Sequence, residues 1–271
     1  MAKNNLHKHY TTMQITSSSP NFTSRNAYIR RADDIVRKVR NEFPMFSPSS
    51  AWDNWRVLKS NNPICKKARK MLQRQTDMLN AYRKSITSTE NAPYFIDVFE
   101  KVQKTKIGNC GEASTMTLGA CIANGYRAVK MSPTVEMRVF DKNSKEVFNW
   151  RRACDHGIVM AKMDKLNPKS TKDVVILDTW AGKAMSYKEA LKEYNDEYMT
   201  GDFLPTLLQT HKEMIKQKGL KGLFMVLSTK FTYEPKMVFT TMEKWDFSCE
   251  ENLELGEKIA KKFPQILMSE K

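Results

Sequence analysis

Residues 106–116, KIGNCGEASTM, place Cys110 in a glycine-flanked turn that leads into small, helix-tolerant residues. The apolar positions that follow keep a helical spacing as far as Asn124-Gly125, a pair typical of a left-handed helix end. Cys110 is therefore expected at a helix N-terminus, where free N–H groups and the positive end of the helix dipole favour a thiolate. A thiolate is nucleophilic, but free cysteines also commonly fill small buried spaces, so the segment predicts one of these two roles.

The rest of the chain predicts helices first and strands afterwards. Helical patterns run from a cap at Ser24 to Phe43, from Pro63 to Tyr82, and over 94–102. Strand patterns occur at 134–141, 156–162, 173–180, 222–229 and 236–241, and further helices are predicted over 186–198, 203–218 and 253–263. This order indicates an α+β domain rather than a regular βαβ alternation.

Composition divides the chain into three segments. Residues 1–23 are polar, serine-rich and without a period, which predicts a flexible lead. Residues 24–90 are predicted to form a helical N-terminal extension, and residues 91–271 are predicted to form the main domain, which contains Cys110. No internal repeat is visible.

The chain is strongly basic, with 45 Lys and Arg against 30 Asp and Glu and a formal net charge of +15. Basic residues cluster in the first third, at 25–40 and 65–75. Such a surface attracts nucleic acid, anionic membranes or acidic proteins. Neither an aromatic-interleaved RNA-binding motif nor a helix-turn-helix is present, so the sequence favours a solvated basic face and an acidic protein partner over nucleic acid.

The five cysteines are widely scattered and include no CxxC pair, which argues against a disulfide framework and a zinc ribbon. The first fourteen residues lack the apolar core of a cleaved signal, and no apolar run is long enough to span a bilayer. We therefore expect a soluble protein with reduced thiols, located in a cytoplasm or secreted without a cleaved signal. The C-terminal segment 250–271 could serve such export or could be an ordinary amphipathic helix.

Two of the four histidines, His7 and His9, lie in the predicted lead. His156 opens a predicted strand, where a sheet would hold the imidazole rigidly, whereas His211 lies in a lysine-rich helix that looks solvent-facing. His156 is therefore the better candidate for a general base that acts on Cys110. The alternative is a structural histidine at a strand end.

A base needs an acceptor that orients it. Asp155 is adjacent to His156, but neighbouring strand residues point to opposite faces. Asp178 ends the buried run VVIL, and a strand paired beside 156–162 would bring its carboxylate level with His156, although it could instead start the turn that follows. Trp180 could cover the His156–Asp178 pair from water or belong to the core.

A metal site is the other chemistry considered, because Cys154 and His156 form a Cys-x-His pair. Further ligands would have to come from Cys110, Cys121 or an aspartate, and these show no motif spacing. The sequence therefore predicts neither a metal nor a cofactor.

The blocks GNCGEAS (108–114), DHGIV (155–159) and VVILDTWAG (174–182) are similar to the three motifs of papain-like and transglutaminase-like thiol enzymes, especially bacterial effector and toxin domains. The resemblance implies an α+β papain-like domain in which the nucleophile-bearing helix packs on an antiparallel sheet. It implies Cys110 as nucleophile, His156 as base and Asp178 as the orienting carboxylate. Two positions depart from the family pattern: Gly157 stands where alanine is frequent and Thr179 where proline is usual.

Papain-like proteases also use a glutamine shortly before the cysteine to help bind the oxyanion. Gln103 lies seven positions before Cys110, close to but not at the usual offset. Asn109 is a second candidate donor. Glu112, in the first turn of the predicted helix, is expected to cap backbone N–H groups.

Together these features predict an enzyme that attacks an amide carbonyl of a protein substrate. A peptide amine as leaving group would make it a protease, ammonia would make it a glutamine deamidase, and transfer to an amine would make it a transglutaminase. The resemblance also raises delivery into a host cell as an effector. A rival interpretation is a binding protein that keeps this scaffold and uses its basic helices.

Overall fold

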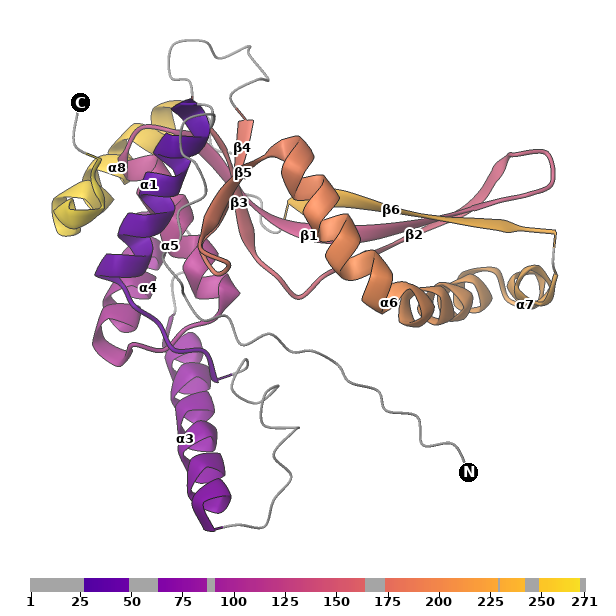
Figure 1. Cartoon of the computed structure of the whole chain (residues 1–271), viewed down its shortest axis with the longest axis horizontal. Coiled ribbons are helices and arrows are strands. Elements are labelled where there is room, and N and C mark those ends of the chain that lie inside the picture. The colour runs from indigo at the N-terminus through magenta and orange to yellow at the C-terminus, as the bar shows by residue number, and fades with distance from the viewer. Residues whose placement is uncertain are drawn as a thin grey trace, which may run out of the picture.

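The computed structural model describes residues 27–48, 63–86, 91–163, 174–228, 230–241 and 249–268. It is a mixed α+β structure built around one antiparallel sheet (Figure 1). The helices are α1 (Ala27–Glu42), α3 (Pro63–Ser85), α4 (Asn91–Thr105), α5 (Cys110–Ala123), α6 (Tyr187–Lys218), α7 (Leu220–Leu227) and α8 (Cys249–Lys262), with a 3-10 turn η2 (Pro264–Ile266). The α+β class and the antiparallel sheet predicted from the sequence are confirmed. No helix in the described part of the chain is long and apolar enough to cross a membrane.

Six strands form the sheet. They are β1 (Arg127–Phe140), β2 (Glu146–Ala153), β3 (Ile158–Lys162), β4 (Val174–Asp178), β5 (Lys183–Ser186) and β6 (Thr232–Thr241). β1 is the longest and pairs with β2, β3 and β6, while β4 pairs with β3 and then with β5. All these pairings are antiparallel.

β2 and β3 pair with successive parts of β1, and a bulge separates them. The register joins Thr134 to Ala153 and Met131 to Ile158, so that two residues of β1 oppose the four residues 154–157. One of the two is Pro133, whose carbonyl accepts the Cys154 N–H at 2.8 Å. Proline has no N–H to return a ladder bond, and bulges are where sheets tolerate it. The bulge carries His156 and turns it out of the regular strand pattern.

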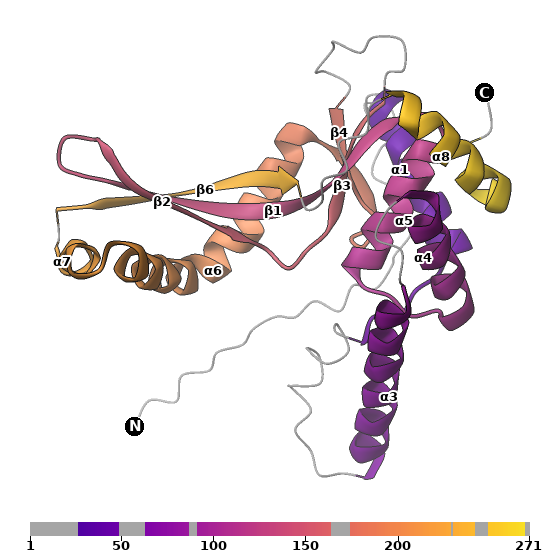
Figure 2. The same ribbon diagram turned by 180° about the vertical axis from the view of Figure 1, so that it is seen from behind.

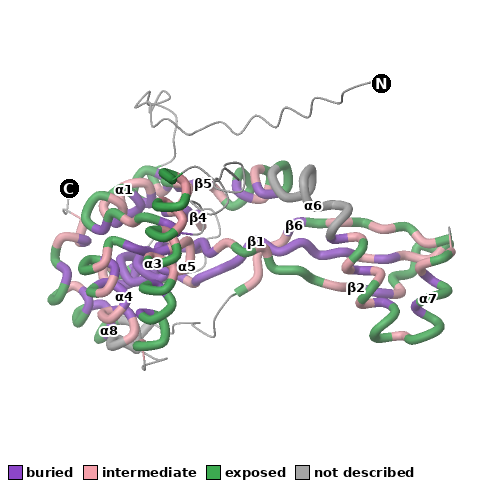
Figure 3. The backbone as a smooth tube through the Cα atoms, turned by 90° about the horizontal axis from the view of Figure 1, so that it is seen from below, coloured by how far each residue is buried: buried purple, intermediate pink, exposed green. Residues whose placement is uncertain are grey.

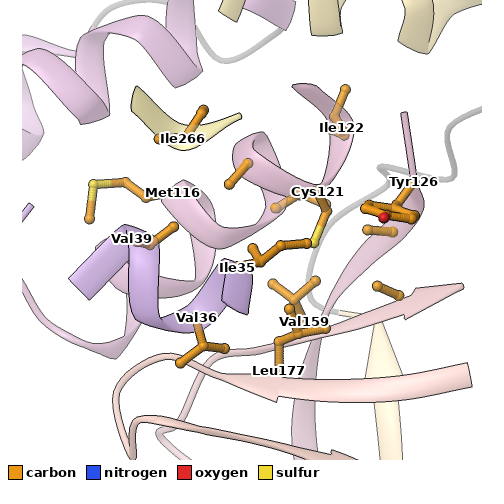
Figure 4. Close-up of a cluster of buried hydrophobic side chains, with 14 of the residues drawn as sticks. Ile35, Val36, Val39, Met116, Cys121, Ile122, Tyr126, Val159, Leu177 and Ile266 are labelled. Atoms are coloured by element: carbon orange, nitrogen blue, oxygen red, sulfur yellow. The ribbon is translucent and has the colours of Figure 1, made fainter. Parts of the chain in front are cut away.

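α5 lies in the middle of the main core, and every residue from Glu112 to Ile122 in it is buried. α1, α4 and α8 pack around it, and β1 and β3 lie against it (Figure 2). Figure 4 shows α1 side chains such as Ile35 and Val39 packed in the same cluster as Met116, Val159 and Leu177. An α-helix buried on all sides is apolar or small all round, and the sequence of α5 has this composition.

The domain boundary predicted at residue 91 does not separate two cores. Five residues of α1 at helical spacing are buried in the main core: Ile29, Ala32, Ile35, Val36 and Val39. α1 is therefore part of the main domain, whereas α3, the other described helix of the predicted extension, projects from it, with Leu79 and Tyr82 as its buried residues (Figure 1). The predicted lead 1–23 and the Ser24 cap lie outside the described residues.

The structure corrects three further elements. The strand predicted at 222–229 is the helix α7, because a short apolar run does not by itself distinguish a strand from a helix. The two helices predicted over 186–198 and 203–218 are one helix, α6. β2 was not predicted; only Phe148 in it is fully buried, so its apolar alternation is weak.

Candidate active site

Cys110 is the first residue of α5, as predicted. Asn109 precedes it in an extended conformation and acts as the N-cap residue. The Asn109 backbone N–H donates to the carboxylate of Glu112 at 2.8 Å, so Glu112 caps the helix as the sequence suggested. Acidic groups are stabilising at this end of a helix, and the cap fixes the direction in which Cys110 is presented.

Arg83 of α3 holds Glu112 from the other side. Its guanidinium donates from Nε at 2.7 Å and from Nη2 at 2.9 Å to the two carboxylate oxygens. Such a two-point contact is the strongest form of a side-chain ion pair, and the carboxylate itself is buried. The projecting helix α3 is thereby tied to the helix that carries Cys110.

His156 lies in the bulge between β2 and β3, and its backbone N–H donates to the carbonyl of Cys154 at 2.8 Å. The imidazole Nε2 lies 2.8 Å from Asp178 Oδ2, and the side chain of Cys110 lies near enough to the ring to help raise the pKa of the imidazole. Burial by itself lowers the pKa of His156, but the interactions with Asp178 and Cys110 outweigh it and raise the pKa to about 10. The imidazole therefore interacts with both other members of the predicted triad.

Asp178, the last residue of β4, is almost fully buried, with a side chain only 2 % exposed. Its Oδ1 accepts the Ala181 N–H at 2.9 Å, and its Oδ2 accepts the Tyr194 hydroxyl at 2.6 Å as well as the His156 bond. Burial favours the neutral acid, yet the bonds from His156, Ala181 and Tyr194 hold the pKa of this carboxyl below its usual value. Asp178 thus remains a carboxylate and fixes the orientation of the imidazole.

The structure distinguishes the two candidate acceptors. Asp155 is exposed, and it is its backbone carbonyl that faces Cys110, 3.8 Å from Sγ. Tyr194 of α6 was not anticipated as a site residue. The spacing of Ala190 and Tyr194 places Tyr194 on the buried face of the predicted helix. The hydrogen bond of its hydroxyl to Asp178, however, depends on how α6 crosses the sheet.

The departures from the family motifs have local causes. A Cβ on Gly157 would lie 2.6 Å from Ser114 Oγ and 3.3 Å from the carbonyl of Cys110, so the space that an alanine needs is taken by α5. Thr179 pairs its hydroxyl with that of Thr117 in the interior, a contact that proline cannot make. Both departures tighten the packing of α5 on the strands that carry His156 and Asp178.

The predicted supporting residues Gln103, Asn109 and Trp180 differ in where they lie relative to Cys110 and His156. Gln103 is exposed on α4 and has no hydrogen bond to Cys110 or His156, so the structure does not bring it to the site. The backbone N–H of Asn109 donates to Glu112 in the helix cap, and the side-chain Oδ1 of Asn109 accepts a hydrogen bond from the Ser47 hydroxyl at 3.0 Å. Trp180 lies half-buried in the turn between β4 and β5, two residues after Asp178.

The first N–H groups of α5 offer donors in place of Gln103. No acceptor within the described ranges is bonded to the N–H of Cys110 or Gly111. A Cβ on Gly111 would meet nothing within 4 Å, so the approach to this end of the helix is open. These two N–H groups are in the position from which a helix N-terminus can bind a developing negative charge.

His211 was predicted to face solvent, and this is wrong. It is half-buried on α6, where its ring packs edge-on against Tyr233 with centroids 5.3 Å apart, and burial lowers the pKa of His211. Its Nε2 has no hydrogen-bond partner in the described part of the chain. Within that part, no three His, Cys, Asp or Glu side chains are arranged to hold a metal ion.

Comparison of the chain with protein-family models, with curated proteins and with solved structures found no match. The similarity to papain-like and transglutaminase-like enzymes therefore rests on the three short motifs. Those motifs are the segments that meet in space: Cys110, His156 and Asp178 come from α5, the β2–β3 bulge and the end of β4.

Proposed function

We propose that the protein is a thiol enzyme that attacks an amide carbonyl of a protein substrate. The observation that carries the proposal is the position of His156, whose ring is hydrogen-bonded to Asp178 at 2.8 Å and has the side chain of Cys110 as its other nearby polar group. A thiol, an imidazole and a carboxylate in this order are what nucleophilic acyl transfer requires. Because Nε2 faces Asp178, the other ring nitrogen, Nδ1, is the one that serves Cys110.

The reaction follows from these contacts. His156, whose pKa is raised to about 10, holds the proton of Cys110 before the reaction begins. The thiolate forms a bond to the carbonyl carbon while the carbonyl electron pair moves onto oxygen. The N–H groups of Cys110 and Gly111 bind that oxygen. His156 returns its proton to the departing nitrogen as the C–N bond breaks, which leaves a thioester on Cys110. The oxygen of a water molecule then forms a bond to the thioester carbon while His156 takes a proton from the water, and the C–S bond breaks, which releases a carboxylic acid and returns the thiolate of Cys110.

The fold supports the same proposal. The nucleophile stands at the start of a buried helix packed on an antiparallel sheet. The base comes from the bulge that precedes β3, and the carboxylate comes from the end of β4, which pairs with β3. This is the arrangement that a papain-like domain implies. Asp178 at 2 % and His156 at 11 % side-chain exposure lie where charges interact most strongly, while Cys110 at the helix end stays partly accessible.

Charge favours a protein substrate over a small amide. The chain carries a net charge of +15. Many of its basic residues lie on the two N-terminal helices α1 and α3. An acidic protein would be steered towards such a surface. We place the enzyme in a cytoplasm or, as its motifs suggest for an effector, in a host cell after secretion.

The three possible outcomes differ in the product, which one experiment can separate. The wild type and a Cys110→Ala control are each incubated with a cell lysate, with and without an added primary amine, and the peptides are compared by mass spectrometry. New peptide N-termini identify a protease, a gain of 1 Da at glutamine identifies a deamidase, and amine-tagged glutamine identifies a transglutaminase. Identical products from wild type and Cys110→Ala would contradict the enzyme proposal and support a binding role.

A further inference from the structure

A pocket of about 300 Å³ opens beside the start of α5 and plays no part in the reaction described above. Its walls come from α3, α4, α5 and β1 and include Tyr82, Arg83, Gly111, Glu112 and Lys130. Gly111 directly follows Cys110, and its N–H is one of the two donors assigned to the carbonyl oxygen. A group seated in this pocket therefore lies next to the amide that Cys110 attacks.

Tyr82 has an unsatisfied polar group in this pocket. The residue is 7 % exposed, and its hydroxyl has no hydrogen-bond partner among the residues that the structure describes. Burial and the nearby charge of Glu112 raise the pKa of Tyr82, so the group is a neutral hydroxyl with a proton to donate. A buried hydroxyl without a partner is costly, and a ligand that accepts its bond recovers that cost.

The other polar groups of the pocket are mainly donors. Lys130 is 5 % exposed, and its ammonium donates to Thr115 Oγ1 at 3.0 Å. Arg83 uses Nε and Nη2 for Glu112, and a guanidinium has five N–H donors in all. Glu112 is the one carboxylate in the lining, and both of its oxygens already accept bonds from Arg83. The lining thus includes hydrogen-bond donors and two cations, and its one carboxylate already accepts the bonds of Arg83.

We propose that this pocket is a specificity subsite that binds a carboxylate of the substrate, next to the amide attacked by Cys110. The role of the pocket as a substrate subsite rests on the proposed function, whereas its binding of a carboxylate does not. A carboxylate accepts bonds only, which matches a donor-lined pocket, and charge-assisted bonds are about twice as strong as neutral ones. The carboxylate comes from an aspartate or glutamate side chain or from the C-terminus of a peptide.

Binding is tested first, in the full chain with Cys110→Ala, so that no reaction is needed. Three probes are titrated by NMR: N-acetylglutamate α-amide, N-acetylglutamine α-amide and N-acetylglycine, which carries only a terminal carboxylate. We expect the glutamate probe to bind about tenfold more tightly than the glutamine probe, the difference that one charge-assisted bond provides. If N-acetylglycine alone binds tightly, the carboxylate subsite stands and its natural ligand is a chain terminus.

Tyr82→Phe removes only the hydroxyl and should reduce the preference for a carboxylate several-fold. Tyr233→Phe is the matched control, because the Tyr233 hydroxyl is also buried and has no hydrogen-bond partner among the described residues, but it lies on β6 and is not part of the pocket lining. The control should leave the preference unchanged. Equal affinity for all three probes, or a carboxylate preference that survives Tyr82→Phe intact, would overturn the subsite.

A second measurement tests the carboxylate subsite and the proposed enzyme activity separately. N-Chloroacetyl versions of the glutamate and glutamine probes alkylate Cys110 in the wild-type chain, and the modification rates are followed by mass spectrometry. If Cys110 reacts through His156 but at equal rates with both probes, the subsite fails and the enzyme stands. If Cys110 is inert while the binding preference persists, the pocket stands and the enzyme fails.

Discussion

The body of the protein around α5 and the arm formed by α6, α7 and the far ends of β1, β2 and β6 are packed very differently (Figures 1 and 2). In the body, side chains from α1, α4, α5, α8 and the sheet form one large cluster. Among the described residues, the outer part of the arm has one small buried cluster, formed by Val139, Phe148, Met214 and Met225. In Figure 3, buried segments gather in the interior of the body, between helices whose outer turns are exposed, while exposed and intermediate residues predominate along α7 and β2 in the arm.

This difference shows where chemistry can be held precisely. Cys110, His156 and Asp178 all lie in the body, at the ends of elements whose other residues are buried. In α7, by contrast, Leu220, Phe224 and Leu227 are largely exposed. Regions with few buried apolar contacts open at lower free energy than a core, so the arm is expected to unfold locally while the site persists.

The largest effect is expected from Asp178→Asn. An amide cannot accept all of the bonds from His156, Ala181 and Tyr194, so the imidazole loses both its charge partner and its orientation. Turnover should fall by about two orders of magnitude or more, the usual range for positioned acid–base catalysis. Turnover is measured with the substrate found by mass spectrometry, and Cys110 alkylation serves as a second readout.

The matched control lies in the arm. Glu146→Gln weakens a part-exposed ion pair with Arg138, which has side-chain exposures of 39 % and 34 % for the arginine and the glutamate. Stability should change by less than about 1 kcal/mol, and Cys110 alkylation should not change. An effect of Glu146→Gln on alkylation as large as that of Asp178→Asn would show that the arm is coupled to the site.

The pH dependence of stability offers a second test of the body. The pKa of His156 is raised from 6.5 to about 10, so the folded chain keeps a proton that the unfolded chain has released. The contribution of His156 to stability is therefore complete below pH 6.5 and is lost as the pH rises towards 10. The comparison uses two variants, Cys110→Ser and Cys110→Ser/His156→Gln, so that no thiol titrates at the site. The free energy of unfolding of Cys110→Ser should exceed that of the double variant, and this difference should shrink from about pH 6 to about pH 9.5. Urea unfolding at the two pH values measures it, and an advantage that grows with pH would contradict the assignment.

Two glycines at helix crossings compare the body and the arm directly. A Cβ on Gly256 would lie 2.8 Å from the carbonyl oxygen of Ile122 in α5, and one on Gly222 would lie 2.1 Å from that of Met214 in α6. Gly256→Ala pushes α8 off the main core and should cost about 1–3 kcal/mol of unfolding free energy. Gly222→Ala has the closer clash but displaces only α7. The backbone amides of α6 and α7 should therefore exchange their hydrogens faster, while the free energy of global unfolding should change little. Equal losses of global stability would remove the distinction between the two regions.

The smallest effect is expected from Gly157→Ala, which brings a methyl group to Ser114 Oγ at 2.6 Å. The shift of the α5 N-terminus should slow Cys110 alkylation by about tenfold, the equivalent of 1.4 kcal/mol. The double variant Gly157→Ala/Ser114→Ala removes the obstructing oxygen and should recover most of the rate. A rate that stays low in the double variant would show that the clash is not the cause.

Parts of this structure could be predicted because they depend on neighbouring residues. The start of α5 at Cys110, its cap at Asn109 and Glu112, and its end before Gly125 follow from local patterns, and Gly125 has the expected positive φ of 74°. β4 is a continuous apolar run and is buried as expected. The placement of Asp178 opposite His156 followed from assuming that their strands pair, and β3 and β4 do pair.

The remaining features depend on contacts between distant segments. The four-residue bulge around His156 is set by Pro133 on β1, and the Asp178 network is completed by Tyr194 on α6. The contact of Arg83 with Glu112 joins helices that the sequence assigned to two separate domains. No local pattern marks these partners. For the same reason, the apolar run of α7 could not be distinguished from a strand before its packing on α6 was known.

The central claim is that His156 and Asp178 make Cys110 a reactive thiol, and the pH dependence of its alkylation tests this most directly. Iodoacetamide modification of Cys110 and of Cys65, a part-exposed cysteine on α3, is followed by peptide mapping from pH 5 to 9 in the wild type and in His156→Gln. We predict that Cys110 reacts rapidly at pH 6, where an ordinary thiol is protonated and Cys65 is slow, and that His156→Gln abolishes the difference. If Cys110 follows the profile of Cys65 in both proteins, the thiol and the imidazole do not act together and the proposed enzyme is contradicted.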